Sequence, residues 1–435
     1  MLGQETISDK ENESYIENKI RVATEGFPFE YKANQVRNLS IKENALSIAN
    51  FLIELKNEGV GDSTKQDYSF TLCKLSDHAN KKFAEVTRDD VLSYLDSHRK
   101  PEDQDPTHKW KGSYNLRKIH IGKFFKWLKK PEVMEGIHGQ KRKEKSPYKP
   151  SDLWTSEDNI VFLRYCPSIR IRCYQMVAND SSCRPHEILK LKIKDIVFKQ
   201  VDGKQYAEIL VNGKTGSRHI PLIHSIPYVK EWLDAHPIKN NPKAPFICAV
   251  SKGLGHRVTT DSLNKTFHSY KTELFPRLLK NPQIPQEDKN IIAALLQKPW
   301  NPYIFRHSAL TNKSKILKEH VLRQHAGWSV NSNMPQVYVH YFGNESSESI
   351  LEAYGLKPSI TQQDKLKPVT CPNCGIDNKI DSKFCVKCRL ALTLEASLDA
   401  EEARKQKEAQ ERENNDTVRA QLLEIKERLD RLGLT

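Results

Sequence analysis

Apolar residues recur with a helical period over much of the chain, and the first such stretch predicts a small all-α domain. Between Ser40 and Lys130, four patterns follow one another with apolar side chains gathered on one helix face. Their apolar positions are Ala45, Leu46, Ile48, Ala49, Leu52 and Leu55; Tyr68, Leu72 and Leu75; Val91, Leu92 and Leu95; and Leu116, Ile119, Phe124, Phe125 and Leu128. We assign residues 35–130 to this domain and residues 1–34, which are polar and charged, to a weakly ordered N-terminal arm.

A second, mixed domain is predicted over residues 153–356. Helical patterns surround two alternating stretches, 207–211 and 219–222, that are typical of strands. The sequence Gly213-Lys214-Thr215-Gly216 between them has the composition of a hairpin turn, with Lys214 at its tip. The Pro-punctuated stretch 275–302 contains a helical pattern near 288–297, and we expect it to be a surface elaboration. The predicted fold class is therefore mainly α with a small antiparallel β-sheet.

Linkers and a tail complete the organisation. Residues 131–152 are rich in Pro, Gly and Lys and are typical of a charged, extended linker, as is the shorter stretch 357–369. Residues 370–392 carry paired cysteines, and 393–435 form a highly charged helical pattern. In that tail an a/d seam about two heptads long predicts a short coiled coil or a docking helix, although a lone surface helix fits nearly as well. The seam residues are Val418, Leu422, Ile425, Leu429 and Leu432.

Charge favours a polyanionic partner. The 435 residues include 69 Lys and Arg against 55 Asp and Glu, and the acid-rich tail makes the remainder more basic still. Nucleic acid is the better expectation than a membrane surface, because no basic amphipathic helix or lipidation motif occurs. No run approaches the ~18 apolar residues of a membrane span, and the N-terminus lacks the apolar segment of a signal peptide. We therefore expect a cytoplasmic, nucleoid-associated protein.

Four of the nine cysteines form a metal-binding pattern. Cys371 and Cys374 make one CxxC pair, and Cys385 and Cys388 make another ten residues later. Four thiolates in two such pairs suit tetrahedral Zn²⁺, and the spacing is that of a zinc ribbon. The remaining cysteines are isolated, which indicates free thiols in a reducing compartment. We predict a structural Zn²⁺ that folds a small module with little core of its own.

The stretch 301–341 places residue types suited to phosphodiester chemistry close together in the sequence. Breaking such a bond without a nucleotide cofactor needs cationic donors on the non-bridging oxygens, an acid for the leaving 5′ hydroxyl and a nucleophile in line. Arginine suits the first task because its guanidinium makes paired bonds to phosphate. A hairpin lysine can deliver the proton, and a tyrosine oxygen can form a covalent phosphodiester.

Five motifs in order resemble one enzyme family. They are CRPHEI at 183–188, VNGKTGSRHIPL at 211–222, YIFRHS at 303–308, HAGW at 325–328 and MPQVYVHY at 334–341. Their order and spacing are similar to those of the tyrosine recombinases of the phage integrase family, which includes lambda integrase, Cre and the Xer proteins. The resemblance covers about Arg37 to Leu356 and is closest to an archaeal-type or mobile-element integrase. It implies a helical core-binding domain at 35–130 and a catalytic domain at 153–356.

The resemblance also implies roles for individual residues. Arg184 and Arg306 match the two phosphate-binding arginines, with Glu187 orienting the first. Lys214 matches the hairpin lysine that acts as general acid, and Trp328 falls where the family carries His or Trp. Tyr338 matches the nucleophile, and it is favoured over Tyr341 because the family's tyrosine precedes a His by two residues, as Tyr338 precedes His340.

The clear departure from the family pattern is Tyr303. It occupies the place of the usual His in HxxR, and a phenol of ordinary pKa near 10 is a poor base at neutral pH. Activation of Tyr338 is then left to the arginines or to His307, which follows Arg306 and is interpreted first as a structural or orienting residue. The substitution puts the base assignment in doubt.

The family implies a function, a partner and an assembly. The expected activity is site-specific cleavage and rejoining of double-stranded DNA through a 3′-phosphotyrosyl intermediate, by a tetramer on two DNA sites, with no metal needed for the chemistry. Two alternatives stay open. One is a type IB topoisomerase that relaxes DNA without exchanging partners. The other is a DNA-binding regulator with weakened catalysis, which the departure at Tyr303 would allow.

Overall fold

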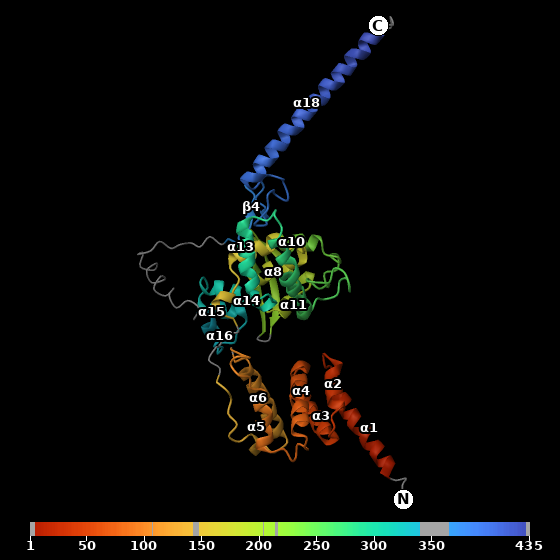
Figure 1. Ribbon diagram of the computed structural model, residues 1–435, viewed down its shortest axis with the longest axis vertical. Coiled ribbons are helices and arrows are strands. Elements are labelled where there is room, and N and C mark those ends of the chain that lie inside the picture. The colour runs from red at the N-terminus through yellow and green to blue at the C-terminus, as the bar shows by residue number, and fades with distance from the viewer. Residues whose placement is uncertain are drawn as a thin grey trace, which may run out of the picture. The chain divides into compact units, whose positions relative to one another are not determined.

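The chain divides into two compact units, Met1–Lys145 and Ser146–Thr435 (Figure 1). The computed structural model describes residues 5–106, 108–141, 148–202, 204–213, 216–339 and 365–431. Within these residues helices dominate both units, and the strands form one three-stranded and one two-stranded antiparallel sheet. The predicted fold class, mainly α with a small antiparallel sheet, is confirmed.

The first unit is a helical bundle around one apolar core. Phe124 meets Phe51 and Phe83 edge to face there, with ring centroids 5.3 and 4.8 Å apart, and Leu52 and Leu72 are fully buried in the same core. A capping box at the start of α5 confirms that local polar groups set the helix boundary. The helices are α1 (Glu5–Thr24), α2 (Glu30–Arg37), α3 (Lys42–Asn57), α4 (Asp62–Ala79), α5 (Arg88–Asp96), α6 (Trp110–Trp127) and the 3-10 turn η1 (Pro131–Met134).

The N-terminal segment differs from the expected weakly ordered arm. From Glu5 it forms α1 and then α2, and Ile16, Ile20 and Ala23 are buried in the core of the first unit. These residues recur at four- and three-residue intervals, so they share one helix face. Three apolar positions among many charges are a weak pattern in the sequence, and the neighbouring helices supply the surface that buries them.

Ile20 provides a test of this packing. Replacing it with alanine is expected to lower the free energy of unfolding by about 2–5 kcal/mol, because the side chain is buried and the vacated space cannot fully close. Val22, two residues along the same helix, is exposed, so Val22→Ala serves as the matched control. Urea unfolding of the two variants gives the comparison. Equal midpoints would restore the interpretation of a detached arm.

The second unit wraps helices around a three-stranded sheet in the order β1-β2-β3. Strand β2 pairs with β3 through Ile209 opposite Ile220, and the pairing runs out to Gly213 opposite Gly216. This confirms the predicted hairpin. Strand β1 was not predicted, because only Ile196 of its six residues is buried and no apolar alternation marks it. The strands are β1 (Ile196–Val201), β2 (Lys204–Gly213) and β3 (Gly216–Leu222).

The helices of this unit pack on a second large core. They include α7 (Ser156–Tyr165), α8 (Ile169–Ser181), α9 (Pro185–Lys190), α10 (Ile226–Asp234), α11 (Thr260–Ser269), α14 (Pro302–Ser314), α15 (Glu319–Ala326) and α16 (Met334–Val339). The short 3-10 turn η2 (Pro150–Asp152) precedes α7, and η3 (Ile193–Asp195) follows α9. Trp154 ties the start of the unit to α14, because its backbone N–H donates to Ser308 Oγ at 2.9 Å.

The stretch 275–302 is part of the core and not the surface elaboration that we expected. It forms α12 (Phe275–Leu279), after the π-helical turn η4 (Tyr270–Leu274), and α13 (Gln286–Gln297). Phe275, Ile292 and Leu295 are fully buried, and Phe275 stacks on Phe162 of α7. Pro276 and Pro302 lie in the first turns of α12 and α14, and Pro285 is the N-cap of α13, so these prolines mark helix starts.

A small module and a long helix end the described chain. Strands β4 (Val369–Thr370) and β5 (Asp377–Asn378) pair in the module, and α18 (Leu394–Arg431) is one continuous helix (Figure 1). Val418, Leu422 and Ile425 of α18 are exposed, and Leu432 of the predicted seam lies outside the described residues. Pairing through this seam stays a prediction. Among the described helices none is both long and apolar enough to cross a membrane.

Candidate functional site

Six residues singled out in the sequence line one cavity of about 300 Å³ in the second unit. They reach it from the N-terminal end of α9, from α14, from the loop after α15 and from α16. The six are Arg184, Tyr303, Arg306, His307, Trp328 and Tyr338. Because helices distant in sequence supply them, their convergence is a property of the fold.

Arg306 is the buried cation of this cavity. Its guanidinium donates to the carbonyl of Ser182 at 2.5 Å and to the carbonyl of Ala326 at 2.9 Å. Burial, and then the charge of Arg184, lower its pKa to about 10, so it remains protonated at neutral pH. No carboxylate forms an ion pair with it among the described residues. A buried cation without a counterion favours binding of an anion.

Arg184 is held at the edge of the cavity by Glu187. The Glu187 carboxylate accepts the backbone N–H of Arg184 at 2.9 Å and its guanidinium at 3.1 Å. Arg218 of β3 donates to the same carboxylate at 2.8 Å. Burial opposes ionisation of Glu187, but the hydrogen bonds from Arg218 and Arg184 outweigh it and bring its pKa down to about 2. Glu187 is therefore a buried anion held between two guanidinium groups.

Arg218 is a site residue that sequence analysis missed. Besides Glu187 it contacts the carbonyl of His325 at 3.0 Å, and so it connects α9, β3 and the end of α15. A Cβ on Gly327 would come within 2.7 Å of its guanidinium, which leaves room there only for glycine. The signal was present in the sequence: Arg218 alternates in phase with Ile220 and Leu222, so it occupies an inward position of the strand.

Tyr338 is buried beside two other rings. Its hydroxyl lies 3.1 Å from Nδ1 of His307. Its ring stacks against His307, with centroids 5.5 Å apart, and against Trp328 at 5.3 Å. It also packs in a small apolar cluster with Leu310 and Leu322. The phenol is thus positioned by ring packing and by its contact with His307.

His307 lies between the catalytic candidates and the interdomain linker. Burial, and then the charge of Arg306, lower its pKa to about 4, so it is neutral at physiological pH. The ring of Tyr148 meets it edge to face at 4.8 Å, although residues 131–152 were expected to be only a linker. Tyr303 is 40% exposed at the start of α14, where its backbone N–H donates to Asn301 Oδ1 at 3.0 Å.

Several predicted site residues fall outside the described part of the chain. Lys214, which the sequence predicts at the hairpin tip, is one of them, and the described residues next to it are the paired Gly213 and Gly216. Tyr341, the alternative nucleophile, and His340 also lie outside it. Their roles stay predictions.

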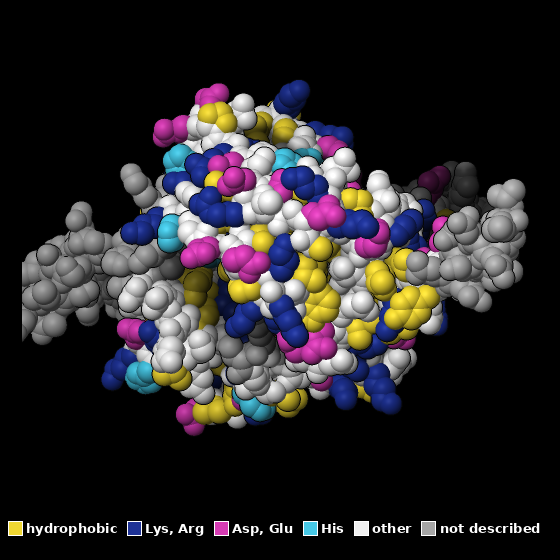
Figure 2. All heavy atoms as spheres, turned by 90° about the horizontal axis from the view of Figure 1, so that it is seen from below, with side chains coloured by type: hydrophobic (Ala, Val, Ile, Leu, Met, Phe, Trp, Pro, Cys, Tyr) yellow, Lys and Arg dark blue, Asp and Glu magenta, His cyan; other side chains and the backbone are white. Residues whose placement is uncertain are grey.

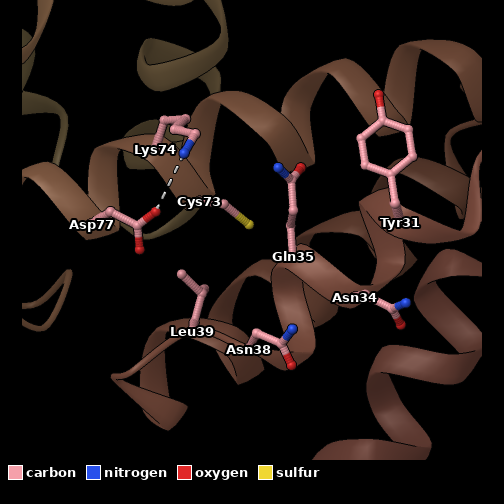
Figure 3. A pocket seen from close by; sticks show the side chains of 8 residues that line it. All are labelled: Tyr31, Asn34, Gln35, Asn38, Leu39, Cys73, Lys74 and Asp77. Carbon is pink, nitrogen blue, oxygen red and sulfur yellow. Dashed lines mark ion pairs between the residues drawn. The ribbon is translucent and has the colours of Figure 1, made fainter.

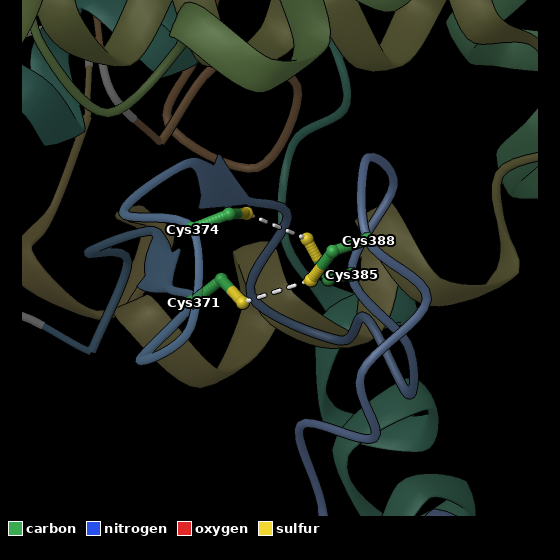
Figure 4. A group of neighbouring side chains, drawn as sticks. All are labelled: Cys371, Cys374, Cys385 and Cys388. Atoms are coloured by element: carbon green, nitrogen blue, oxygen red, sulfur yellow. Dashed lines mark hydrogen bonds between the residues drawn. The ribbon is translucent and has the colours of Figure 1, made fainter.

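The four predicted cysteines gather in the C-terminal module (Figure 4). Their Sγ atoms all lie within 4.8 Å of one another, and the pairs 371–388 and 374–385 are each 3.5 Å apart. Asn378 joins the two knuckles, because its side chain donates to the carbonyl of Ile376 and accepts the backbone N–H of Val386. Four soft donors in this arrangement could hold one metal ion.

The cysteine module is docked on the helices of the second unit. Lys379 pairs with Glu231 of α10 at 2.8 Å, and Glu231 also contacts Arg172 of α8. Ile380 packs on the unit's core. The cluster is therefore held on the helical scaffold, and none of its four cysteines is among the residues that line the arginine cavity.

The first unit has a different cavity, of about 390 Å³, between α2 and α4 (Figure 3). Amide side chains of Asn34, Gln35 and Asn38 line it, with Lys74 and Asp77 paired at 3.8 Å. It contains no arginine, so we place the candidate chemistry in the second unit. On the face drawn in Figure 2, Lys and Arg side chains lie among Asp and Glu and do not form one continuous basic patch.

Comparison with known proteins gives structural likeness only. No protein-family model and no curated protein matches the chain. Among solved structures, it resembles the XerH site-specific recombinase bound to palindromic difH, at 17% identity and a TM-score of 0.49, over 78% of this chain and 95% of that one. A lambda integrase dimer bound to a core site matches at 13% identity, a TM-score of 0.47, and 69% and 77% coverage. The Tn1549 transposon integrase in complex with transposon right end DNA matches at 10% identity and a TM-score of 0.47, over 71% of this chain and 99% of that one.

Proposed function

We propose that this chain is a site-specific DNA recombinase of the tyrosine recombinase, or phage integrase, family, and that it serves a mobile element. The observation that carries the proposal is the convergence of Arg184, Arg306 and Tyr338 on one cavity. Glu187 is the carboxylate paired with Arg184 and with Arg218, whereas Arg306 has no ion pair among the described residues, so three guanidinium groups stand against one carboxylate. The remaining positive charge suits a phosphodiester.

The proposed reaction uses a small set of groups. Arg184 and Arg306 bind the non-bridging oxygens of the scissile phosphate, and the Trp328 indole N–H donates to the same group. Tyr338 attacks the phosphorus and forms a 3′-phosphotyrosyl bond, while Lys214 protonates the leaving 5′ oxygen. The 5′ hydroxyl of a partner strand then attacks this bond and releases Tyr338. Double-stranded DNA is the substrate, and a tetramer holds two sites.

The C-terminal cysteine cluster has a structural task in this proposal. Cys371, Cys374, Cys385 and Cys388 would hold Zn²⁺, which ties the two knuckles together and supplies no step of the reaction. The long α18 helix provides a surface for assembly through Val418, Leu422 and Ile425.

Metal removal tests this division of roles. A chelator is expected to release one zinc ion per chain and to increase hydrogen exchange over residues 365–392, because the module has little other core. Cys371→Ser should give the same result without a chelator, whereas Cys73→Ala, which removes a buried thiol of the first unit, should keep the ion. Zinc content and hydrogen exchange are the measurements. A metal-free protein with an unchanged exchange pattern would contradict a structural role.

The proposed function is tested with nicked duplexes. A randomised pool is incubated with the full chain, covalent adducts are isolated, and the DNA and the attached peptide are sequenced. We expect a defined DNA site and a peptide modified at Tyr338. Exchange between two differently labelled duplexes of that site then separates a recombinase from a topoisomerase. Absence of any adduct would leave a DNA-binding regulator as the better assignment.

A further inference from the structure

The contact between Tyr338 and His307 suits removal of the phenolic proton, a step that the arginines cannot perform. A tyrosine that attacks phosphorus must lose its phenolic proton, and arginine at neutral pH has no lone pair to accept it. The Tyr338 hydroxyl lies 3.1 Å from Nδ1 of His307, within the reach required of a general base.

We propose that Nδ1 of His307 accepts the phenolic proton of Tyr338 during strand cleavage and returns it during rejoining. The inference rests on the proposed function, and it assigns the base that the replacement of the family's His by Tyr303 leaves open. His307 follows Arg306 directly on α14. The same helical turn therefore carries a phosphate-binding group and a proton acceptor.

Ring packing keeps the Tyr338 hydroxyl and Nδ1 of His307 close to each other. The planes of His307 and Tyr338 differ by 28°, and Tyr148 and Trp328 pack on the two rings. Such contacts restrict rotation of both side chains, so the hydroxyl and Nδ1 stay within reach of each other. Tyr303 is a weaker candidate, because it is 40% exposed and the Tyr338 hydroxyl contacts His307.

The charges around His307 couple its function to DNA. Arg306 is adjacent and Arg184 lines the same cavity; among the described residues, the other titratable groups facing it are the phenols of Tyr148, Tyr303 and Tyr338. A protonated His307 beside two guanidinium groups is unfavourable in the free protein. A bound phosphodiester adds the negative charge that offsets this repulsion. Proton transfer is thereby favoured only when the substrate is in place.

The step balances without another reactant. The Tyr338 O–H bond breaks and its proton moves to Nδ1 of His307, while the phenolic oxygen forms a bond to phosphorus. The bond from phosphorus to the 5′ oxygen breaks, and that oxygen takes a proton from Lys214. Attack by a 5′ hydroxyl reverses each transfer, so both side chains return to their initial protonation states.

The experiment compares His307→Gln with His320→Gln on the nicked duplex selected above. His320 is exposed on α15, so its variant controls for the loss of an imidazole elsewhere. We expect His307→Gln to form the adduct about 10²- to 10⁴-fold more slowly, the usual contribution of a general base. Its rate should rise with pH toward the ordinary phenol pKa of ~10, whereas the wild-type rate changes much less across the neutral range.

A fluorinated tyrosine at position 338 separates proton transfer from positioning. Its lower phenol pKa reduces the need for a base, so it should restore much of the rate of His307→Gln while changing the wild-type rate little. If the variant stays slow with the fluorinated residue and keeps the wild-type pH profile, His307 only orients Tyr338 and the proposal is overturned. Absence of any adduct from the wild-type chain overturns the proposed function instead.

Discussion

Tyr338→Phe is expected to abolish covalent attachment of the chain to DNA. The change removes only the phenolic oxygen, which is the atom proposed to attack phosphorus. The ring can keep its stacking on Trp328 and His307 and its place in the apolar cluster with Leu322. The loss of one hydrogen bond to His307 should cost stability by only about 1 kcal/mol.

DNA binding by the same variant should persist, because Arg184 and Arg306 are unchanged. The measurements are adduct formation on the selected nicked duplex, equilibrium binding to the intact duplex at several salt concentrations, and thermal unfolding. Tyr206→Phe, a change on strand β2, is the matched control and should form adduct normally. An adduct formed by Tyr338→Phe would show that another residue attacks, and Tyr341 would be the first to test.

Glu187→Ala is expected to destabilise the second unit by roughly 3–5 kcal/mol. Arg218 is buried and donates to Glu187 at 2.8 Å. The substitution would therefore leave the Arg218 guanidinium buried without this carboxylate, which is costly. The backbone N–H of Arg184 loses its acceptor as well. Adduct formation by this variant should remain low even at a lower temperature at which the variant is folded. The reason is that Glu187 no longer holds Arg184 at the cavity.

The pH dependence of this loss identifies its electrostatic origin. The pKa of Glu187 is lowered from 4.5 to about 2, so its carboxylate stabilises the folded state above pH 4.5. That contribution shrinks as the pH falls from 4.5 toward 2, since the unfolded chain then takes up a proton that the folded chain resists. The difference in unfolding free energy between wild type and Glu187→Ala should follow this course in urea titrations at several pH values.

Two comparisons control the Glu187 experiment. Glu208→Ala removes a half-buried carboxylate of β2 that pairs with Lys199 at 2.7 Å, and its effect should be much smaller than that of Glu187→Ala because solvent reaches this ion pair. Combining Glu187→Ala with Arg218→Met removes both buried charges and should recover part of the lost stability. A double variant no more stable than the single one would indicate that packing, and not charge, accounts for the loss.

Much of the candidate site followed from the sequence because its chemistry depends on residue type and short spacing. The CxxC pairs predicted the cluster at Cys371, and Gly213 and Gly216 predicted the hairpin that should carry Lys214. Helical periodicity located α8, α10 and α13, since apolar faces repeat every three or four residues. These patterns are local, so they can be identified without knowing which elements meet.

Only the tertiary structure decided which distant groups touch. No spacing predicted that Arg218 would share Glu187 with Arg184, or that Tyr148 of the expected linker would pack on His307. The burial of α1 and of the stretch 275–302 was not predicted either. Their apolar patterns are weak in the sequence, and their apolar residues become buried because neighbouring helices cover them. Local sequence sets the chemistry of each residue and the apolar face of each helix. Burial and long-range pairing depend instead on how the whole unit packs, and that packing determines which groups are charged, neutral or able to exchange a proton.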